Sequence, residues 1–378
     1  MNTPKIIQLT PPLLSENHIK ERITCIRGHR ERIFNTSLQI MDDKFIFHNY
    51  GHGGACWTFL FGCVHSSLRL SGPFHPTLKL RRTGRLEASA VYPELCRRGG
   101  QGIFLKGKPI TIIGAGCYGL LTAILLKRAG HTVTIVAKDI HSIPSYKAAG
   151  FFFPRPRKVS NAQETEIFLE RGIESYRTYL EIIEGTHPFI KAGAQILPAY
   201  YDRTIDPGFA PYIAQGLMLP AQDVLIDFNN GKRYPTHEYQ ALFINASIMM
   251  SELQRNIREL VIPLIQKEIV SFHEIQDSII FNCSNLGAKA LTHDTKIIPI
   301  QGHLISLAHQ PIAQLQYMIN YKVTMPGPRG TPRDELIYFA PKDSGILGIT
   351  FIRGQDSLTA NQHEFDRLLL RCKDFFGS

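Results

Sequence analysis

The sequence lacks the features that would place it in a membrane, outside the cell or around a structural metal. No run of about 18 uncharged apolar residues occurs, so we expect no transmembrane helix. The first thirty residues lack the basic-then-apolar pattern of a secretory signal. The seven cysteines include no CxxC pair, which argues against a disulfide framework or a zinc site and indicates a reducing, cytoplasmic environment.

Acidic residues are scarce in the first third of the chain. The 378 residues carry 42 Lys and Arg against 32 Asp and Glu, a net charge of +10. Residues 1–109 hold 16 of these basic residues and only 7 of the acidic ones, so nearly all of the excess lies there. One interpretation is a surface for nucleic acid or an anionic membrane. The other, which we favour, is a solvated surface or linker, because charge runs are usually solvated.

The hydrophobic pattern is that of an ordinary folded protein, with 44% hydrophobic and 20% charged residues. Its clearest local signal lies between residues 110 and 136. Ile110–Ile113 is a short β-branched run, and the sequence Gly114-Ala-Gly116-Cys-Tyr-Gly119 follows it. Apolar residues then recur at helical spacing up to Lys127, and Thr132–Val136 reads as a second strand. This order of strand, glycine turn, helix and strand predicts a βαβ unit that binds a dinucleotide.

Each glycine of the turn has an expected role. Gly114 permits the tight turn, Gly116 lets the backbone approach a pyrophosphate, and Gly119 lets the helix pack closely on the strand. The amino terminus of the helix offers unpaired N–H groups to the phosphates. A carboxylate for the adenosine ribose is expected about 20 residues later, where the sequence has Ala137-Lys138-Asp139. No carboxylate stands at the position that the simple template gives, although Asp139 is close to it, so the ribose contact stays open.

The remaining pattern predicts further helices and two kinds of sheet. Helices are expected over residues 162–185, over 246–259 and from about Asn361 onward. Pro263–Phe272 and Ser278–Ser284 are strand-like, and the last hundred residues alternate as an antiparallel sheet would. The expected fold class is α/β with an α+β substrate region, in which a Rossmann-like parallel sheet binds the cofactor and an antiparallel sheet forms a substrate domain.

Several segments together resemble the D-amino-acid oxidase and D-aspartate oxidase family. His48-Asn-Tyr-Gly-His-Gly-Gly54 with Thr58 is similar to that family's HNYGHGGxGxT signature. Ile112–Gly119, Ser145–Pro154, Glu268–Phe272, Asn282–Leu291 and Gln301–Leu307 also resemble family segments. These segments span nearly the whole chain except residues 73–108.

The order of the segments differs from the family's, in which the NYGHGG segment lies near the carboxyl terminus. The simplest interpretation is a circular permutation, which close-lying termini make tolerable. Residues 1–72 would then be the displaced carboxyl-terminal segment, and 73–108 a basic connector. Residues 109–160 and 265–300, with 40–70, would form the FAD-binding domain. Residues 161–264 and 301–378 would form the substrate domain.

The resemblance implies FAD as cofactor, an amino acid and oxygen as reactants, and no metal. A D-amino acid would be oxidised to an imino acid, which hydrolyses to a keto acid and ammonia, while oxygen becomes hydrogen peroxide. Hydride transfer from Cα to flavin N5 would need no side-chain base. No membrane partner is implied, and a homodimer is left open.

The resemblance also implies site residues. Arg27 stands at the family's carboxylate-binding arginine, Tyr338 at its assisting tyrosine, and the Gly54 carbonyl would accept from the substrate amine. The residues implied to contact FAD lie in six segments: Gly114, Gly116, Cys117, Tyr118 and Gly119; Lys138 and Asp139; Ser145, Ala148, Ala149, Gly150 and Phe151; Ile269; Cys283 and Ser284; and Gly53, Gly54, Ala55, Cys56, Trp57 and Thr58.

Each of these assignments has a structural alternative. Arg27 could be a surface or salt-bridging residue, Tyr338 a core residue, and His52 a hydrogen-bonding neighbour rather than a base. Asp334 occupies the position of the family's second lid tyrosine, beside Arg329 and Arg333, which could select an acidic substrate or face water. Three other functions are considered: a glycine- or sarcosine-type amine oxidase, a flavoprotein whose basic segment binds an acidic partner, and, least favoured, an NAD-dependent dehydrogenase.

Overall fold

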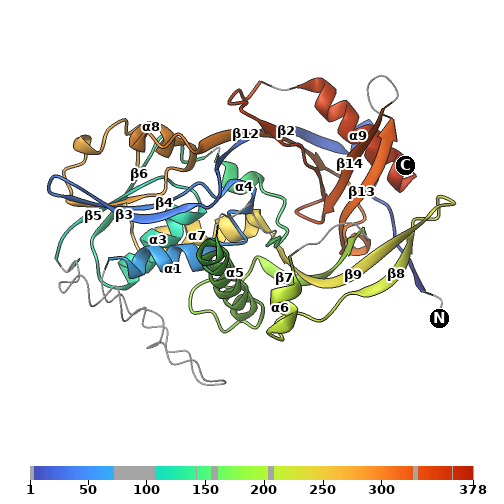
Figure 1. Ribbon diagram of the computed structural model, residues 1–378, viewed down its shortest axis with the longest axis horizontal. Coiled ribbons are helices and arrows are strands. Elements are labelled where there is room, and N and C mark those ends of the chain that lie inside the picture. Colours follow the sequence, from blue (N-terminus) through green and yellow to red (C-terminus); the bar gives the residue numbers. More distant parts are fainter. Residues whose placement is uncertain are drawn as a thin grey trace.

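The computed structural model describes residues 4–71, 105, 107–141, 143–154, 161–202, 208–326, 331–359 and 361–377. Its strands form two sheets that lie toward opposite ends of the long axis, with helices between and around them (Figure 1). None of the helices in these ranges is long and apolar enough to cross a membrane. The combination confirms the α/β fold class expected from the sequence.

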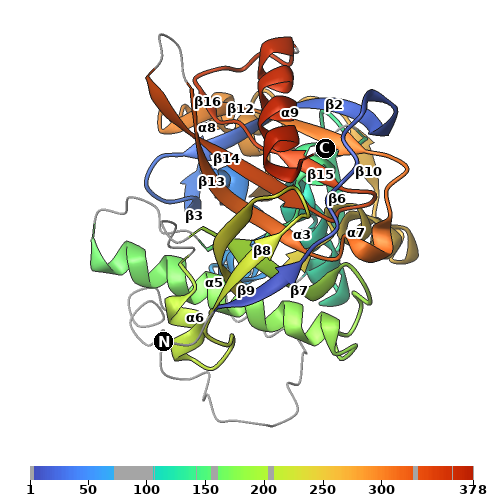
Figure 2. The same ribbon diagram turned by 90° about the vertical axis from the view of Figure 1, so that its right-hand side faces the viewer.

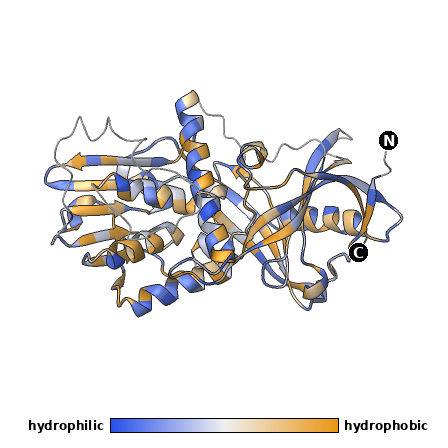
Figure 3. Ribbon diagram, turned by 90° about the horizontal axis from the view of Figure 1, so that it is seen from below, coloured by the Kyte–Doolittle hydropathy of each residue, from blue (hydrophilic) through white to orange (hydrophobic). Residues whose placement is uncertain are grey.

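The first sheet has six strands and is parallel except at one edge. Its order is β10 (Leu264–Gln266), β6 (Val133–Ala137), β5 (Ile110–Ile113), β11 (Ile279–Asn282), β4 (Lys44–Tyr50) and β3 (Asn35–Met41). Only β3 runs antiparallel, to its neighbour β4. Every residue of β5 and of β11 is buried, as expected for parallel strands that are covered on both faces. These strands are largely orange at the left of Figure 3.

Two helices pack directly on strands of the six-stranded sheet: α1 (Leu60–Arg69) on β3 and β4, and α3 (Cys117–Arg128) on β5 and β6. The other helices of this part are α4 (Pro144–Lys147), α5 (Ala162–Ile183) and α7 (Ala246–Glu259), which pack mainly on other helices. α5 and α7 begin where the sequence predicts, because Asn161 and Asn245 accept hydrogen bonds from the first backbone N–H groups of each helix. α1 packs on α5, and α3 packs on α7.

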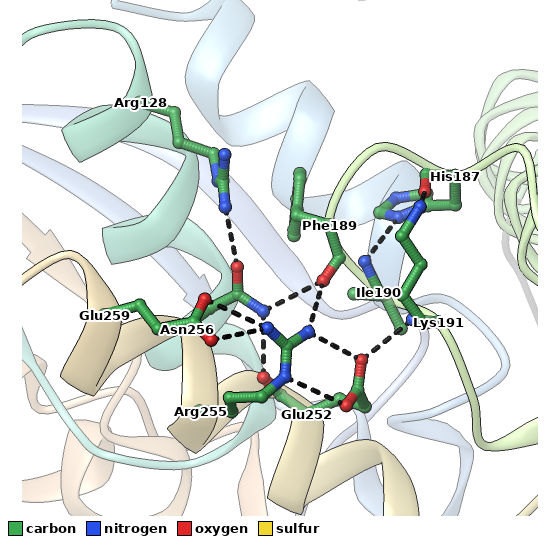
Figure 4. A network of polar contacts seen from close by, with 9 residues as sticks. All are labelled: Arg128, His187, Phe189, Ile190, Lys191, Glu252, Arg255, Asn256 and Glu259. Carbon is green, nitrogen blue, oxygen red and sulfur yellow. Dashed lines mark hydrogen bonds and ion pairs between the residues drawn. The ribbon is translucent and has the colours of Figure 1, made fainter.

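A polar network ties the carboxyl end of α3 to α7 and to the loop before β7 (Figure 4). Arg128 Nη2 donates to Asn256 Oδ1 at 2.8 Å, and Asn256 Nδ2 donates to the Phe189 carbonyl at 3.0 Å. Arg255 donates to the same carbonyl at 3.0 Å and pairs with Glu252 and Glu259. The network therefore holds the carboxyl end of α3, the helix that follows the glycine turn.

The second sheet has ten strands and is mostly antiparallel. Its order is β1 (Lys5–Gln8), β8 (Gln222–Asp227), β9 (Arg233–Ile244), β7 (Ala194–Tyr201), β13 (Met318–Pro326), β14 (Pro332–Ala340), β15 (Ile346–Gly348), β12 (Ile297–Leu307) and β16 (Ile352–Arg353), with β2 (Ile19–Arg30) also paired to β12. α9 (Gln362–Phe376) packs on β12, β14 and β15 (Figure 2). Its buried face joins a second hydrophobic core around Phe339 and Phe376.

The molecule also contains short helices and 3-10 turns. α6 (Ala210–Ala214) and α8 (Ala288–Thr292) are single turns. The 3-10 turns are Glu16–His18, Gly53–Ala55, Phe272–Glu274, Asn285–Gly287 and Ile312–Gln314.

The first 71 residues contribute to both sheets. β1 pairs with β8, β2 pairs along β12, and β4 lies between β11 and β3. Their buried side chains, such as Phe47 and Leu60, belong to the same hydrophobic core as Ile112 of β5. This segment is thus an integral part of the two sheets.

Some expected elements differ in the structure. The strand expected over Pro263–Phe272 is only the three residues of β10, and it ends before the 3-10 turn at Phe272. β2 and β3 were not expected from the pattern. Residues 161–264, which we expected in the substrate domain, contribute to both parts of the molecule. The helices α5 and α7 pack on α1 and α3, respectively. The strands β7, β8 and β9 join the ten-stranded sheet. Most of the basic connector lies outside the described residues.

Candidate active site

The glycine turn connects β5 to α3 in a conformation that only glycine tolerates well. Gly114 has φ +110°, and a Cβ there would stand 2.6 Å from the Cys283 carbonyl oxygen. A Cβ on Gly119 would stand 1.9 Å from the Gly114 carbonyl oxygen. Gly116 is the N-cap of α3, and a Cβ there would lie 3.2 Å from Ser145 Oγ. The geometry therefore matches the three roles that the spacing predicts.

The amino terminus of α3 opens onto a cavity. No side chain caps the helix through Gly116, and the Cys117 N–H donates to Ser145 Oγ at 3.2 Å. The first N–H groups of a helix have no partner within it and carry a partial positive charge. This end of the cavity can consequently bind a pyrophosphate.

The cavity has a volume of about 410 Å³ and extends from the six-stranded sheet to the ten-stranded sheet. Every residue that the resemblance assigns to cofactor or substrate lines it except Gly119 and Ala55. Gly119 acts behind the cavity wall through its contact with Gly114. The fold thus brings together segments from residues 25–58, 113–151, 267–291 and 304–349.

Polar side chains mark the end of the cavity at the carboxyl edge of β6 and β10. Lys138 Nζ and Glu268 Oε1 form an ion pair of 2.8 Å, in which both side chains are exposed. Asp139 Oδ1 accepts from the His141 N–H at 3.0 Å. The expected carboxylate therefore has two candidates at this edge, Asp139 after β6 and Glu268 after β10, and the spacing rule had indicated only the first.

Arg27 lies at the other end of the cavity and is 8% exposed. Its Nη2 donates to the Thr350 carbonyl at 2.9 Å, and its Cζ lies 4.7 Å from the centre of the Phe351 ring. Among the described residues, no carboxylate forms an ion pair with it, and the ionisable groups that act on its charge include Cys25, Cys56 and Tyr338. Burial lowers the pKa of Arg27, but an arginine stays charged in proteins. The site therefore offers a buried cation to an anion.

Tyr338 projects from β14 into the same region. Its ring stacks on Phe151, with 4.3 Å between the centroids. Burial raises the pKa of Tyr338, and Arg27 acts in the opposite direction, so the hydroxyl keeps its proton. The structure brings Tyr338, Arg27 and Phe151 to one end of the cavity, where a phenolic donor is available beside the guanidinium.

Aromatic contacts hold the glycine-rich loop of residues 51–54. The His52 ring stacks between Tyr118, at a centroid distance of 3.9 Å, and Phe34, at 5.0 Å. Trp57 Nε1 donates to the Ser145 carbonyl at 3.2 Å, and Tyr118 donates to the Cys56 carbonyl at 2.8 Å. These contacts favour a packing role for His52 over a role as a base, and they hold Trp57 against Ser145.

Cys56 and Cys117 form a pair of buried thiols in the cavity wall. A hydrogen bond between the two side chains lowers the pKa of Cys56, whereas burial raises the pKa of Cys117 well above its usual value. The resemblance places Cys56 and Cys117 in separate segments implied to contact FAD, and nothing in the sequence marks them as a pair.

Each of the described charged lid residues, Asp334 and Arg333, forms an ion pair with another residue of the β13–β14 hairpin. Asp334 forms an ion pair of 2.7 Å with Lys322, and Arg333 pairs with Glu335 at 3.2 Å. Neither Asp334 nor Arg333 lines the cavity, and Arg329 lies outside the described residues. The charges of Asp334 and Arg333 are therefore balanced by Lys322 and Glu335, respectively, within the β13–β14 hairpin.

The cavity also contains residues that sequence reasoning missed. Lys147, Leu304 and Ile349 line it, as do the residues of the turn Asn285–Gly287. Lys147 and Leu304 belong to segments that resemble the family, so their positions were available as a signal. Ile349 follows β15, and no motif pointed to it.

The fold and the cavity define a two-sheet α/β protein that is built around a dinucleotide cofactor. The model of the family described as FAD dependent oxidoreductase matches residues 109–378, and the chain belongs to this family. It is therefore a flavoprotein oxidoreductase, and its cofactor is FAD.

Solved structures support the fold. Glycine oxidase from Geobacillus kaustophilus is 15% identical over 70% of this chain and 78% of its own, with a TM-score of 0.51. Glycine oxidase from Bacillus cereus, also 15% identical, covers 70% of this chain and 79% of its own, with a TM-score of 0.48. An L-amino acid deaminase from Proteus vulgaris is 12% identical over 73% and 76%, with a TM-score of 0.47. The first of these shows the shared architecture.

Proposed function

We propose that this protein is an oxidase of D-amino acids that uses FAD and oxygen, forming an imino acid that hydrolyses to a keto acid and ammonia, with hydrogen peroxide as the second product. The observation that carries this proposal is Arg27, a buried cation without an acidic partner among the described residues, in the cavity that begins at the glycine turn. A substrate carboxylate would provide the negative charge that pairs with Arg27.

The residues of the cavity fit the cofactor. Gly116, the N-cap of α3, has no side chain and lines the cavity, which leaves its backbone accessible to a pyrophosphate, and Gly114 makes the tight turn before it. Asp139 and Glu268 lie at the end where a ribose would be held. FAD supplies the two-electron chemistry when bound, and the protein orients the substrate.

Arg27 and Tyr338 would orient the substrate. A guanidinium binds a carboxylate through two parallel hydrogen bonds, which fixes the direction of the Cα–H bond as well as the affinity. The Tyr338 hydroxyl would donate to the same carboxylate. The Gly54 carbonyl would accept from the amine, since Gly54 lies beside Arg27: a Cβ on Gly54 would stand 3.3 Å from Arg27 Nη1.

The decisive experiment is anaerobic mixing of the purified flavoprotein with a panel of D-amino acids, L-amino acids, glycine and sarcosine. Bleaching of the flavin absorbance by D-amino acids alone would support the proposal. Bleaching by glycine or sarcosine alone would instead establish an amine oxidase, which the same cavity could accommodate. If no amine bleaches the flavin and the protein binds nucleic acid with steep salt dependence, the proposal fails in favour of a binding role for the basic segment.

We also propose that the chain is a circular permutation of the family's order, with residues 73–108 bridging the original ends. Two contacts support this, because a residue near each end of the described chain, Leu9 after β1 and Gly377 after α9, contacts residues 227–230, where β8 passes into β9. Gly377 packs on Asn230, where a Cβ on the glycine would stand 2.4 Å from Asn230 Cβ. Leu9 N–H donates to the Asp227 carbonyl at 2.9 Å.

A relinked gene tests the permutation. Joining residue 377 to residue 4 through a short flexible linker, and opening the chain within 73–104, should give a protein that still folds and binds FAD. A fragment of residues 1–72 that folds by itself would contradict the proposal, since its buried side chains share a core with β5.

A further inference from the structure

Arg27 is held by a chain of buried contacts that begins at His303, outside the cavity. Thr350 lies between the two residues: its carbonyl accepts from Arg27 Nη2 at 2.9 Å, and its hydroxyl contacts His303. His303 is fully buried and Thr350 is 5% exposed. Neither residue lines the cavity.

The hydroxyl of Thr350 is fixed by two contacts with one residue. The His303 backbone N–H donates to Thr350 Oγ1 at 3.0 Å, and His303 Nδ1 lies 2.7 Å from the same oxygen. Oγ1 can accept from the N–H and donate its own proton to Nδ1 at the same time, an arrangement that suits a neutral imidazole with an unprotonated Nδ1. Burial lowers the pKa of His303, in agreement with the neutral form.

The backbone around this pair leaves no freedom for the guanidinium. A Cβ on Gly302, the residue before His303, would stand 2.5 Å from Arg27 Nη2 and 3.2 Å from the Thr350 carbonyl oxygen. The Phe351 ring covers the guanidinium on the other side, although this side chain is 59% exposed. The guanidinium is thus fixed by one hydrogen bond, one ring and the space that a glycine leaves.

We infer that His303 and Thr350 are positioning residues that set the orientation of Arg27 for a substrate carboxylate. The His303–Thr350 contact orients the Thr350 peptide, and the Thr350 carbonyl then orients Nη2. Nη1 is left to face the cavity beside Gly54. The inference rests on the proposed role of Arg27 in binding the carboxylate.

The test uses the FAD-loaded protein and propionate, a carboxylate without an amine, titrated against the flavin absorbance. Thr350→Val removes the hydroxyl at constant shape and should raise the Kd of propionate about tenfold while the Kd of FAD stays unchanged. Thr350→Ser keeps the hydroxyl and should restore an affinity close to that of the unsubstituted protein. A residue that only stabilised the fold would shift the melting temperature without this carboxylate-specific loss.

Two further variants keep the test decisive. Gly302→Ala leaves the hydrogen bonds of His303 in place but displaces Arg27, so it should also weaken propionate; it decides the question if Thr350→Val fails to retain FAD. Arg27→Ala separates the two claims. If Arg27→Ala binds propionate normally, the proposed carboxylate role is wrong. If Arg27→Ala loses propionate while Thr350→Val and Gly302→Ala bind it normally, the positioning inference is overturned.

Discussion

Gly119 and Gly114 are in such close contact that a Cβ added to Gly119 would stand 1.9 Å from the Gly114 carbonyl oxygen. Gly119→Ala must therefore push α3 away from β5 and disturb the N-terminus that faces the cavity. We expect a loss of FAD affinity of at least tenfold, measured by flavin fluorescence on titration of the apoprotein. Lys127→Ala, in the last turn of the same helix, is the control, because Lys127 does not line the cavity. Equal affinities in the two variants would contradict the prediction.

Asn256 should be important for stability although it is far from the chemistry. It is fully buried and joins Arg128 of α3 to the Phe189 carbonyl (Figure 4). Asn256→Ala leaves the Arg128 guanidinium without this acceptor, so we expect the free energy of unfolding to fall by about 2 kcal/mol. Urea denaturation followed by the fluorescence of Trp57, the single tryptophan, measures it. Ser251→Ala, at an exposed position of α7, should cost less than about 0.5 kcal/mol.

His187 should make stability depend on pH. Burial, followed by the charges of Lys191, His65 and Arg128, lowers the pKa of His187 from 6.5 to about 3. Between these values the unfolded chain binds a proton that the folded protein does not, so the free energy of unfolding falls as the pH falls. For one group the slope approaches about 1.4 kcal/mol per pH unit.

The variant His187→Asn tests this slope. Asparagine can accept from the Ile190 N–H, as His187 Nδ1 does at 3.0 Å, without titrating. Urea midpoints between pH 4 and pH 6 should therefore depend less steeply on pH in the variant. Above pH 7.5 the two proteins should differ by a constant amount. Parallel curves through the acid range would show that His187 does not remain neutral in the folded protein.

Lys342 should support the cofactor site from the ten-stranded sheet. It is 5% exposed, and its Nζ donates to the Tyr146 carbonyl of α4 at 2.5 Å. The preceding residue of α4, Ser145, lies against Gly116 and the start of α3. Lys342→Met should weaken FAD binding by about 1 kcal/mol, since a buried charge-assisted hydrogen bond is lost. The exposed Lys322→Met is the control, and a similar loss in both would point to a general effect of removing charge.

Much of the cofactor half could be predicted from the sequence. Gly114, Gly116 and Gly119 have fixed spacing between two apolar strands, so their roles follow from local geometry. The limits of α5 and α7 follow from Asn161 and Asn245, which cap the helices through side-chain hydrogen bonds within three residues. β2 and β3 were missed because their alternation is weak, and their pairing partners lie far away or depend on a turn.

The substrate end was harder to predict. The resemblance pointed to Arg27 and Tyr338. The spacing could not show that Arg27 lacks an acidic partner among the described residues, or that Asp334 pairs with Lys322. The Cys56–Cys117 pair and the alternative carboxylate Glu268 were also missed, since each joins residues from separate segments. Such contacts depend on which separate segments the fold places side by side.

The sequence by itself determined the glycine turn, the helices with their caps and the excess of positive charge in the first third, because these depend on residues a few positions apart. Only the tertiary structure decided which strands the segments of that first third pair with. β2 pairs with β12, and this pairing carries Arg27 to the Thr350 carbonyl across 323 residues. β4 lies beside β11 in the cofactor sheet. Burial then leaves the Arg27 charge without an acidic partner among the described residues, and we propose that a substrate carboxylate provides one.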